Sequence, residues 1–136
     1  MKITEKKELF EYFLEGAEFG STWLEIKTLK KEDALDAEFS EDYLESRCFP
    51  TKAYDRLVRG GHIVCVDWYS AEDNENGRPD KYKLSLKDIE ERLNKAMCDE
   101  SIARTYWEVF GEDGHPDYYD YNNLMQYIMF GEVVYG

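Results

Sequence analysis

Histidine and cysteine are scarce in this sequence, which contains only two His and three Cys residues. Cys48, Cys65 and Cys98 are spaced too widely for a CxxC metal or redox motif, so we expect reduced, packed thiols and no disulfide. Neither His62 nor His115 has an evident catalytic partner along the chain. Metal sites and nucleophilic catalysis draw on these residue types, and their scarcity leads us to expect no metal, no cofactor and no catalytic residue.

Long apolar runs are also missing. The longest unbroken run covers residues 63–66, far short of the ~20 residues that a membrane-spanning helix needs. Residues 1–21 lack the basic start and the apolar stretch of a signal peptide. We therefore expect a soluble, cytoplasmic protein that does not associate with membranes.

Basic residues are few at both ends of the chain, and the formal net charge is −13. Residues 1–46 contain 13 acidic and 6 basic residues, and residues 98–136 contain 8 acidic residues with Arg104 as the only base. An acidic field repels nucleic acids and speeds encounter with basic partners, so we expect a basic protein surface as partner and no direct binding of nucleic acid. Acidity is also a common means of keeping a protein soluble, and that simpler explanation stays open.

Aromatic residues are plentiful: they make up 15% of the 136 residues, and hydrophobic residues make up 43%. Such a composition argues against disorder, and the length suits one hydrophobic core. We expect a single acidic α+β domain over residues 1–136, with five or six short helices around a small antiparallel sheet that contains a central hairpin.

Apolar residues recur with helical spacing in several segments. These segments predict helices over residues 5–16, 51–59, 85–97, 102–110 and 121–130, with a thin, surface-lying helical region in 31–47. Thr4 is a candidate cap for the first helix, Gly16 and Gly20 are candidate stops, and Asp99 or Ser101 is a candidate cap for the fourth.

Four shorter segments have the composition of strands: residues 22–29, 62–69, 81–86 and 132–135. The second is apolar on both sides, which predicts that both of its faces are covered. Asp67 is its one acid, and structural pairing of this acid is favoured over catalysis. The turn residues Asn76 and Gly77 connect it to the third segment as a hairpin.

The C-terminal stretch, residues 117–136, passes from an aromatic helix pattern into a short strand pattern. A chain end that carries Phe130, Val133, Val134 and Tyr135 is expected to be tied into a core, because ends with nothing to bury fray. Residues 124–135 are therefore expected to be scaffold, and residues 117–121 an exposed, charged loop.

Two sets of carboxylates are candidates for partner binding, the second of them interleaved with tyrosines, a composition favoured at interfaces. The first set is Glu32, Asp33, Asp36, Glu41, Asp42 and Glu45. The second is Glu112, Asp113, Asp117, Tyr118, Tyr119, Asp120 and Tyr121. Both could instead be solvated faces, as runs of charge usually are.

Three motifs carry a resemblance to a family of small uncharacterised proteins encoded by bacteriophages and mobile elements of Firmicutes and other gut bacteria. They are YDRLVRGG (residues 54–61), KYKLSLKDIEERL (81–93) and LMQYIMFGEVVYG (124–136). Genes of this kind often lie among small accessory genes, some of which inhibit host defence systems such as CRISPR nucleases. The resemblance implies a phage protein acting in the cytoplasm of a bacterial host cell, and it assigns no site residues.

Together these observations predict a non-enzymatic interaction protein. It would act as a nucleic-acid mimic that blocks the basic groove of a defence protein, in the manner of an anti-CRISPR inhibitor. Two alternatives stay open. One is a small metal-dependent or Cys/His enzyme that uses Asp67, His62 or His115, and the other is a structural or dimerising accessory protein.

Overall fold

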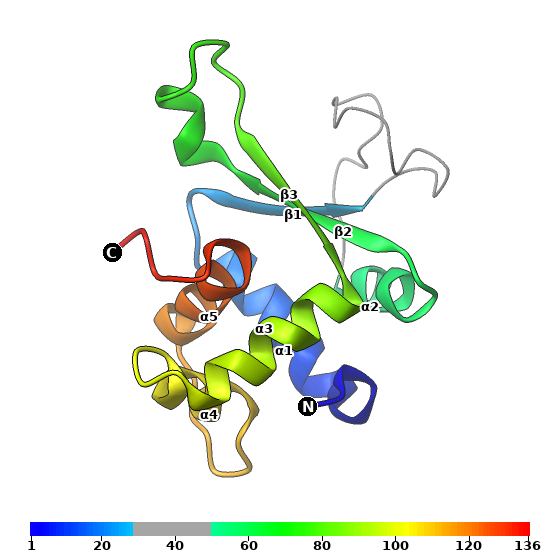
Figure 1. The fold of residues 1–136 in the computed structure, drawn as a ribbon. Coiled ribbons are helices and arrows are strands. Elements are labelled where there is room, and N and C mark those ends of the chain that lie inside the picture. Colours follow the sequence, from blue (N-terminus) through cyan, green and yellow to red (C-terminus); the bar gives the residue numbers. More distant parts are fainter. Residues whose placement is uncertain (29–49) are drawn as a thin grey trace. The chain divides into compact units, whose positions relative to one another are not determined.

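The computed structural model describes residues 1–28 and 50–136 (Figure 1). Contacts divide the chain into two compact units, Met1–Ser21 with Lys87–Gly136, and Thr22–Leu86. The predicted α+β class is confirmed, since the described residues form five α-helices and a three-stranded antiparallel sheet. The single domain over residues 1–136 stays a prediction.

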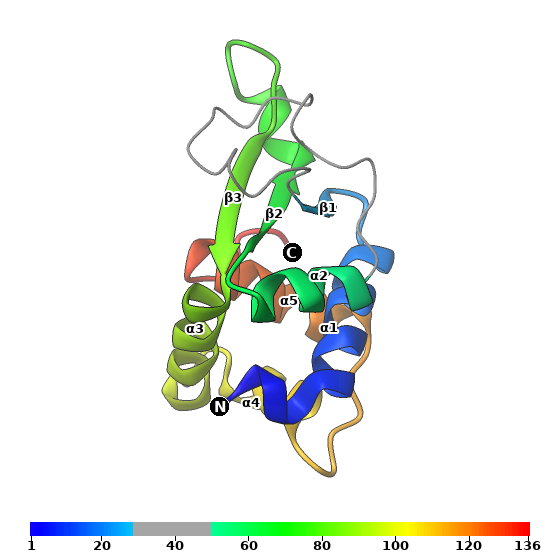
Figure 2. The same ribbon diagram turned by 90° about the vertical axis from the view of Figure 1, so that its right-hand side faces the viewer.

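The sheet belongs to the unit Thr22–Leu86 and has the order β1-β2-β3. Its strands are β1 (Leu24–Thr28), β2 (His62–Asp67) and β3 (Asp80–Ser85), which lie side by side in Figure 2. Cys65 of the central strand pairs with Ile26 on one side and with Tyr82 on the other. Every residue of β2 from Ile63 to Asp67 is buried, which confirms that both faces of this strand are covered.

The central strand is shorter than predicted. It ends at Asp67, and Trp68 begins a 3-10 helix, η4 (Trp68–Glu72). The Asp67 carboxylate caps η4, with Oδ1 accepting the backbone N–H of Tyr69 at 3.1 Å. Ser70 Oγ donates to the Asp67 carbonyl and accepts the N–H of Asp80, both at 2.7 Å. These bonds end the strand because they take the chain into a turn, and they leave Trp68 and Tyr69 exposed.

Helix α2 (Pro50–Val58) belongs to the same unit and lies close to its predicted bounds. Its first residue is Pro50, which suits a helix start because proline lacks the N–H that a first turn leaves unpaired. Ala53 and Leu57 are its buried residues, one turn apart. Gly60 follows with a φ of +89°, the left-handed conformation that closes a helix.

The other unit is helical. Its elements are η1 (Ile3–Lys6), α1 (Lys7–Phe19), α3 (Leu86–Cys98), α4 (Ala103–Phe110) and α5 (Tyr118–Phe130). Phe13 lies at the centre of its aromatic core, with ring centroids 5.6 Å from Phe110 and 6.0 Å from Phe10. Helix α1 thus packs on both α4 and α5.

The predicted start of the first helix was wrong, and of its two candidate stops Gly20 is confirmed and Gly16 is not. Thr4 lies inside η1, so it is not the cap of α1. Gly16 is an interior, buried residue of α1, which continues to Phe19 and ends at Gly20. A Cβ at Gly16 would lie 2.3 Å from Tyr121 Cδ2, so this glycine marks a close helix contact and not a helix end.

Two predictions about the later helices and one about a C-terminal strand need correction. Helix α4 begins after Ile102 and not after a polar cap, because the Asp99 carboxylate instead accepts the backbone N–H and the hydroxyl of Ser101. Helix α5 begins at Tyr118, three residues earlier than predicted, so residues 118–120 are helical. In the described part of the chain, residues 132–135 form no strand.

Residues 132–135 are nevertheless fixed to α5, by hydrogen bonds and one contact between aromatic rings. Gln126, buried within α5, bonds to the backbone of Val134 and Tyr135, and the ring of Tyr135 meets Phe130 edge-on at 5.9 Å. The side chains of Val133 and Val134 are exposed, contrary to the expectation that they are buried. Among the described residues, none of the helices has the length and apolar composition needed to cross a bilayer.

Candidate protein-interaction surface

The two predicted sets of partner-binding carboxylates fall in different parts of the chain. The first set lies within residues 29–49, outside the described residues; it comprises Glu32, Asp33, Asp36, Glu41, Asp42 and Glu45. The second set lies in the helical unit, in the loop between α4 and α5 and at the start of α5. The candidate surface is therefore built from the second set.

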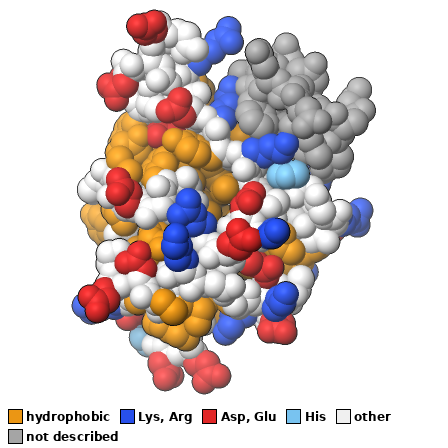
Figure 3. All heavy atoms as spheres, viewed as in Figure 1, with side chains coloured by type: hydrophobic (Ala, Val, Ile, Leu, Met, Phe, Trp, Pro, Cys, Tyr) orange, Lys and Arg blue, Asp and Glu red, His pale blue; other side chains and the backbone are white. Residues whose placement is uncertain are grey.

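The loop between α4 and α5 exposes Glu112 and Asp113 to solvent. Carboxylates gather at the lower tip in Figure 3, where Figure 1 places this loop. Glu108 Oε2 holds the loop by accepting the backbone N–H of His115 at 2.9 Å. A Cβ at Gly114 would lie 2.1 Å from the Glu108 carbonyl oxygen, so the chain passes too close to α4 for any side chain at that position.

Asp117 and Asp120 form a capping box at the start of α5. Asp117 Oδ1 accepts the N–H of Asp120 at 3.0 Å, and Asp120 Oδ2 accepts the N–H of Asp117 at 3.1 Å. Burial raises the pKa of the Asp120 carboxyl, and the nearby charge of Asp117 adds to the increase. These two acids therefore have a structural task, satisfying N–H groups that the first helical turn leaves unpaired.

The three predicted tyrosines occupy different environments. Tyr119 is 76% exposed, and Tyr118 is 54% exposed with its Cβ over Gly20. Tyr121 is half-buried between α5 and α1, where its ring lies 6.4 Å from that of Phe13. Tyr118 and Tyr119 are thus available to a partner, whereas Tyr121 holds the two helices together.

The structure adds residues of α1 that sequence reasoning did not include in the site. Tyr12 and Phe19, two turns apart, are exposed, and Glu8 and Glu15 are exposed beside Tyr12. The pKa of the Tyr12 hydroxyl is raised, first through its hydrogen bond to Glu8 and then by the charges of Glu8 and Glu15, among others. The signal was present in the sequence as the i, i+4, i+7, i+11 spacing of these residues, but only the packing of α1 on α5 joins them to the second set.

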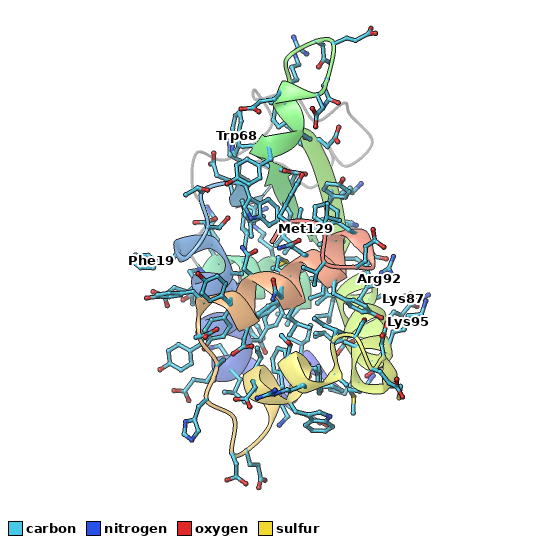
Figure 4. The ribbon with its side chains drawn as sticks, turned by 90° about the vertical axis from the view of Figure 1, so that its left-hand side faces the viewer. Phe19, Trp68, Lys87, Arg92, Lys95 and Met129 are labelled. Atoms are coloured by element: carbon cyan, nitrogen blue, oxygen red, sulfur yellow. The ribbon has the colours of Figure 1, made fainter. Side chains whose placement is uncertain are left out.

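We call the resulting region the acidic aromatic surface. It consists of Glu8, Tyr12, Glu15, Phe19, Glu112, Asp113, Asp117, Tyr118, Tyr119 and Asp120. Residues 8–21 and 105–136, which supply all of it, contain no Lys or Arg. Three bases of the same unit, Lys87, Arg92 and Lys95, are on α3, at the opposite side of this unit from Phe19 in Figure 4. Lys6 and Lys7 instead border the surface, since Lys6 Nζ donates to the Phe110 carbonyl at 3.2 Å and Lys7 Nζ lies 3.8 Å from Glu11 Oε1.

The residues of the alternative, enzymatic hypothesis belong to both units, with His62 and Asp67 in the sheet unit and His115 in the helical unit. His62 and Asp67 are the first and last residues of β2, so their Cα atoms are about 16 Å apart at the rise of a strand. His115 lies exposed in the loop between α4 and α5. Over the two described ranges, no group of three or more His, Cys, Asp or Glu side chains is arranged to hold a metal ion.

The helical unit thus places one surface of mixed carboxylates and aromatic rings on α1, α5 and the loop that precedes α5. Comparison with family models, with curated proteins and with solved structures finds no match to this chain.

Proposed function

We propose that this protein is a non-enzymatic interaction protein whose acidic aromatic surface occupies a basic, nucleic-acid-binding surface of another protein. The observation that carries the proposal is the combination of exposed carboxylates and exposed rings in a region whose chain segments contain no Lys or Arg. Charge alone would serve solubility. Exposed aromatic side chains do not increase solubility, because their contact with water is unfavourable unless a partner covers them.

The mechanism is competition. Carboxylates on the loop and on α1 present negative charge to Lys and Arg side chains that otherwise bind phosphates, and the rings add apolar area that a nucleic acid backbone lacks. The partner's groove is then blocked both sterically and electrostatically. The resemblance to phage and mobile-element proteins makes a host defence protein, such as a CRISPR nuclease, the first partner class to test.

Asp117 and Asp120 are unsuitable for a charge-reversal test of this surface, because both belong to the capping box of α5. Reversing the charge of Asp117 or Asp120 would remove the cap of α5 together with the surface charge, so a loss of binding would be ambiguous. Glu112 and Asp113 are exposed loop residues, and the variant Glu112→Lys/Asp113→Lys changes charge with little risk to the helix.

Glu100→Lys/Glu132→Lys is the matched control, since it makes the same change in net charge with exposed residues. Glu100 precedes α4 whereas Glu112 follows it, and Glu132 follows α5 whereas Asp113 precedes it. The control charges therefore lie at the opposite ends of the same two helices.

The experiment is affinity capture from nuclease-treated bacterial lysate at low salt, followed by elution with rising salt. We expect a nucleic-acid-binding protein that the wild type and the control variant retain, that Glu112→Lys/Asp113→Lys loses, and that added DNA or RNA displaces. Retention should weaken steeply above ~0.1 M salt, where the Debye length is about 10 Å. Equal retention by the two charge variants, or retention that ignores salt, would contradict the proposal.

A further inference from the structure

Phe19 and Tyr118 form an exposed aromatic pair within the acidic aromatic surface. Phe19 is the last residue of α1 and is 75% exposed, and Tyr118 is the first residue of α5 and is 54% exposed. Their ring centroids are 5.7 Å apart, with an interplanar angle of 42°. Figure 4 shows Phe19 at the outer edge of the unit, pointing away from the ribbon. The two rings thus contact each other, while both residues stay more than half exposed to solvent.

The surrounding packing holds the pair in place. A Cβ at Gly20 would lie 2.6 Å from Tyr118 Cβ, which means that the backbone of α1 and the side chain of Tyr118 are in direct contact. The capping box of Asp117 and Asp120 fixes the first turn of α5, where Tyr118 lies. A partner therefore meets rings whose positions are largely set before binding, which lowers the entropy lost on association.

The charge around the pair determines which kind of group can cover it. Glu15 lies one turn before Phe19 on α1, and Asp117 directly precedes Tyr118. Residues 8–21 and 105–136 offer no Lys or Arg to neutralise these carboxylates. A purely apolar partner would bury ring area but would also take carboxylates out of water without pairing them, which is costly.

The cation that fits rings and carboxylates together is the arginine guanidinium. It is planar and weakly hydrated, stacks on aromatic faces, and donates in a fork to carboxylates. The lysine ammonium is a compact, strongly hydrated charge that gains less from a ring face. We infer that the Phe19–Tyr118 pair is a docking point for an arginine side chain of the partner, with the guanidinium against the rings and donating to a neighbouring carboxylate such as Glu15. This inference rests on the proposed function and specifies the partner's chemistry.

The test compares two labelled peptides of equal length and charge, deca-arginine and deca-lysine, binding to the full chain in low salt by fluorescence anisotropy. We expect the arginine peptide to bind at least about fivefold more tightly, as a stacked guanidinium contributes roughly 1 kcal/mol or more. In the variant Phe19→Leu/Tyr118→Leu, which keeps apolar volume but removes the ring faces, the arginine peptide should fall to the affinity of the lysine peptide. The affinity of the lysine peptide should stay unchanged.

Trp107→Leu is the control, because Trp107 is an aromatic residue of the same unit that is 50% exposed on α4 and lies outside the acidic aromatic surface. It should leave both affinities as they are. Circular dichroism of each variant checks that the helices are retained.

The outcomes separate this inference from the proposed function. Equal affinities of the wild type for the two peptides, or a preference for arginine that survives Phe19→Leu/Tyr118→Leu, would overturn the inference. The proposed function would survive that result if Glu112→Lys/Asp113→Lys still weakened both peptides equally. Failure of both peptides to bind would overturn the inference and the proposed function together. A light-scattering mass of twice 16.1 kDa that reverts in Phe19→Leu/Tyr118→Leu would also overturn the inference, since a second copy would then cover the pair.

Discussion

Gln126 binds the backbone of Tyr135 at two points. Its Oε1 accepts the N–H of Tyr135 at 2.7 Å, and its Nε2 donates to the carbonyl of the same residue at 3.0 Å. The same Oε1 accepts the N–H of Val134 at 2.8 Å, and Nε2 also donates to Asn122 Oδ1 at 2.9 Å. The buried side-chain amide of Gln126 thus forms hydrogen bonds with backbone groups of the C-terminal segment, as a neighbouring strand would. These bonds explain why the segment is fixed in place although it forms no strand.

Gln126→Leu should free this segment. The substitution keeps most of the side-chain volume but removes every one of these bonds, and we expect the free energy of unfolding to fall by about 1–3 kcal/mol. Hydrogen exchange measured by NMR should show lost protection at the amides of Val134 and Tyr135. The amide of Gly131, which donates to the Tyr127 carbonyl, is the internal control and should stay protected. Unchanged protection at Tyr135 would mean that other contacts hold the segment.

Gly16→Ala tests the close contact between α1 and α5. Alanine favours a helix interior over glycine by about 1 kcal/mol, so an uncrowded site would be stabilised. Here the new Cβ would lie 2.3 Å from Tyr121 Cδ2 and 2.8 Å from its Cγ, and we expect urea denaturation to show a net destabilisation of about 1–3 kcal/mol. The cost should shrink in a Tyr121→Ala background, where the ring is gone. A stabilised single variant would show that the ring moves aside freely.

Asp117 should contribute to stability as a hydrogen-bond acceptor more than as a charge. Asp117→Ala removes the acceptor for the Asp120 N–H and should cost about 1 kcal/mol. Asp117→Asn keeps a side-chain carbonyl in the same place, so its midpoint of thermal unfolding should stay close to that of the wild type. If Asn proved as damaging as Ala, the negative charge of Asp117 would be the stabilising feature instead.

Asp99 should make stability depend on pH in the acid range. Hydrogen bonds from the hydroxyl and the N–H of Ser101, and from the hydroxyl of Tyr127, lower the pKa of its carboxyl below the ordinary 3.8. A lowered pKa means that the folded state binds the proton more weakly than the unfolded state. The resulting stabilisation is present above pH 3.8 and is lost as the pH falls through the folded-state value.

Ser101→Ala removes the largest cause of that shift, and a carboxyl NMR titration should find the pKa of Asp99 closer to 3.8. Urea denaturation should find the variant less stable than the wild type at pH 7, with the difference shrinking below pH 3.8. Tyr127→Phe, which removes a cause that ranks lower, should shift the pKa less. A pKa of Asp99 that did not change in Ser101→Ala would contradict this account.

Local sequence patterns by themselves determined which segments become helices and strands. The hairpin's alternation and turn residues, the spacing in α2, α3 and α4, and the end of α5 at Phe130 all depend on a few neighbouring residues. Each was predicted close to its observed bounds. The second set of carboxylates was likewise identified from local composition, and the structure finds Glu112 and Asp113 exposed.

Contacts between residues about one hundred positions apart determined how α1 packs on α5 and which residues of α1 join the candidate surface. Gly16 resembles a helix stop in the sequence, and only its contact with Tyr121 shows that it is a packing position inside α1. Gly20 does end α1, and its contact with Tyr118 could not be read from the sequence. The same packing brings Phe19 beside Tyr118 and so adds α1 to the candidate surface. The physical reason is that hydrogen bonds within a helix are local and follow from periodicity, whereas the close approach of two helices depends on which side chains meet across them.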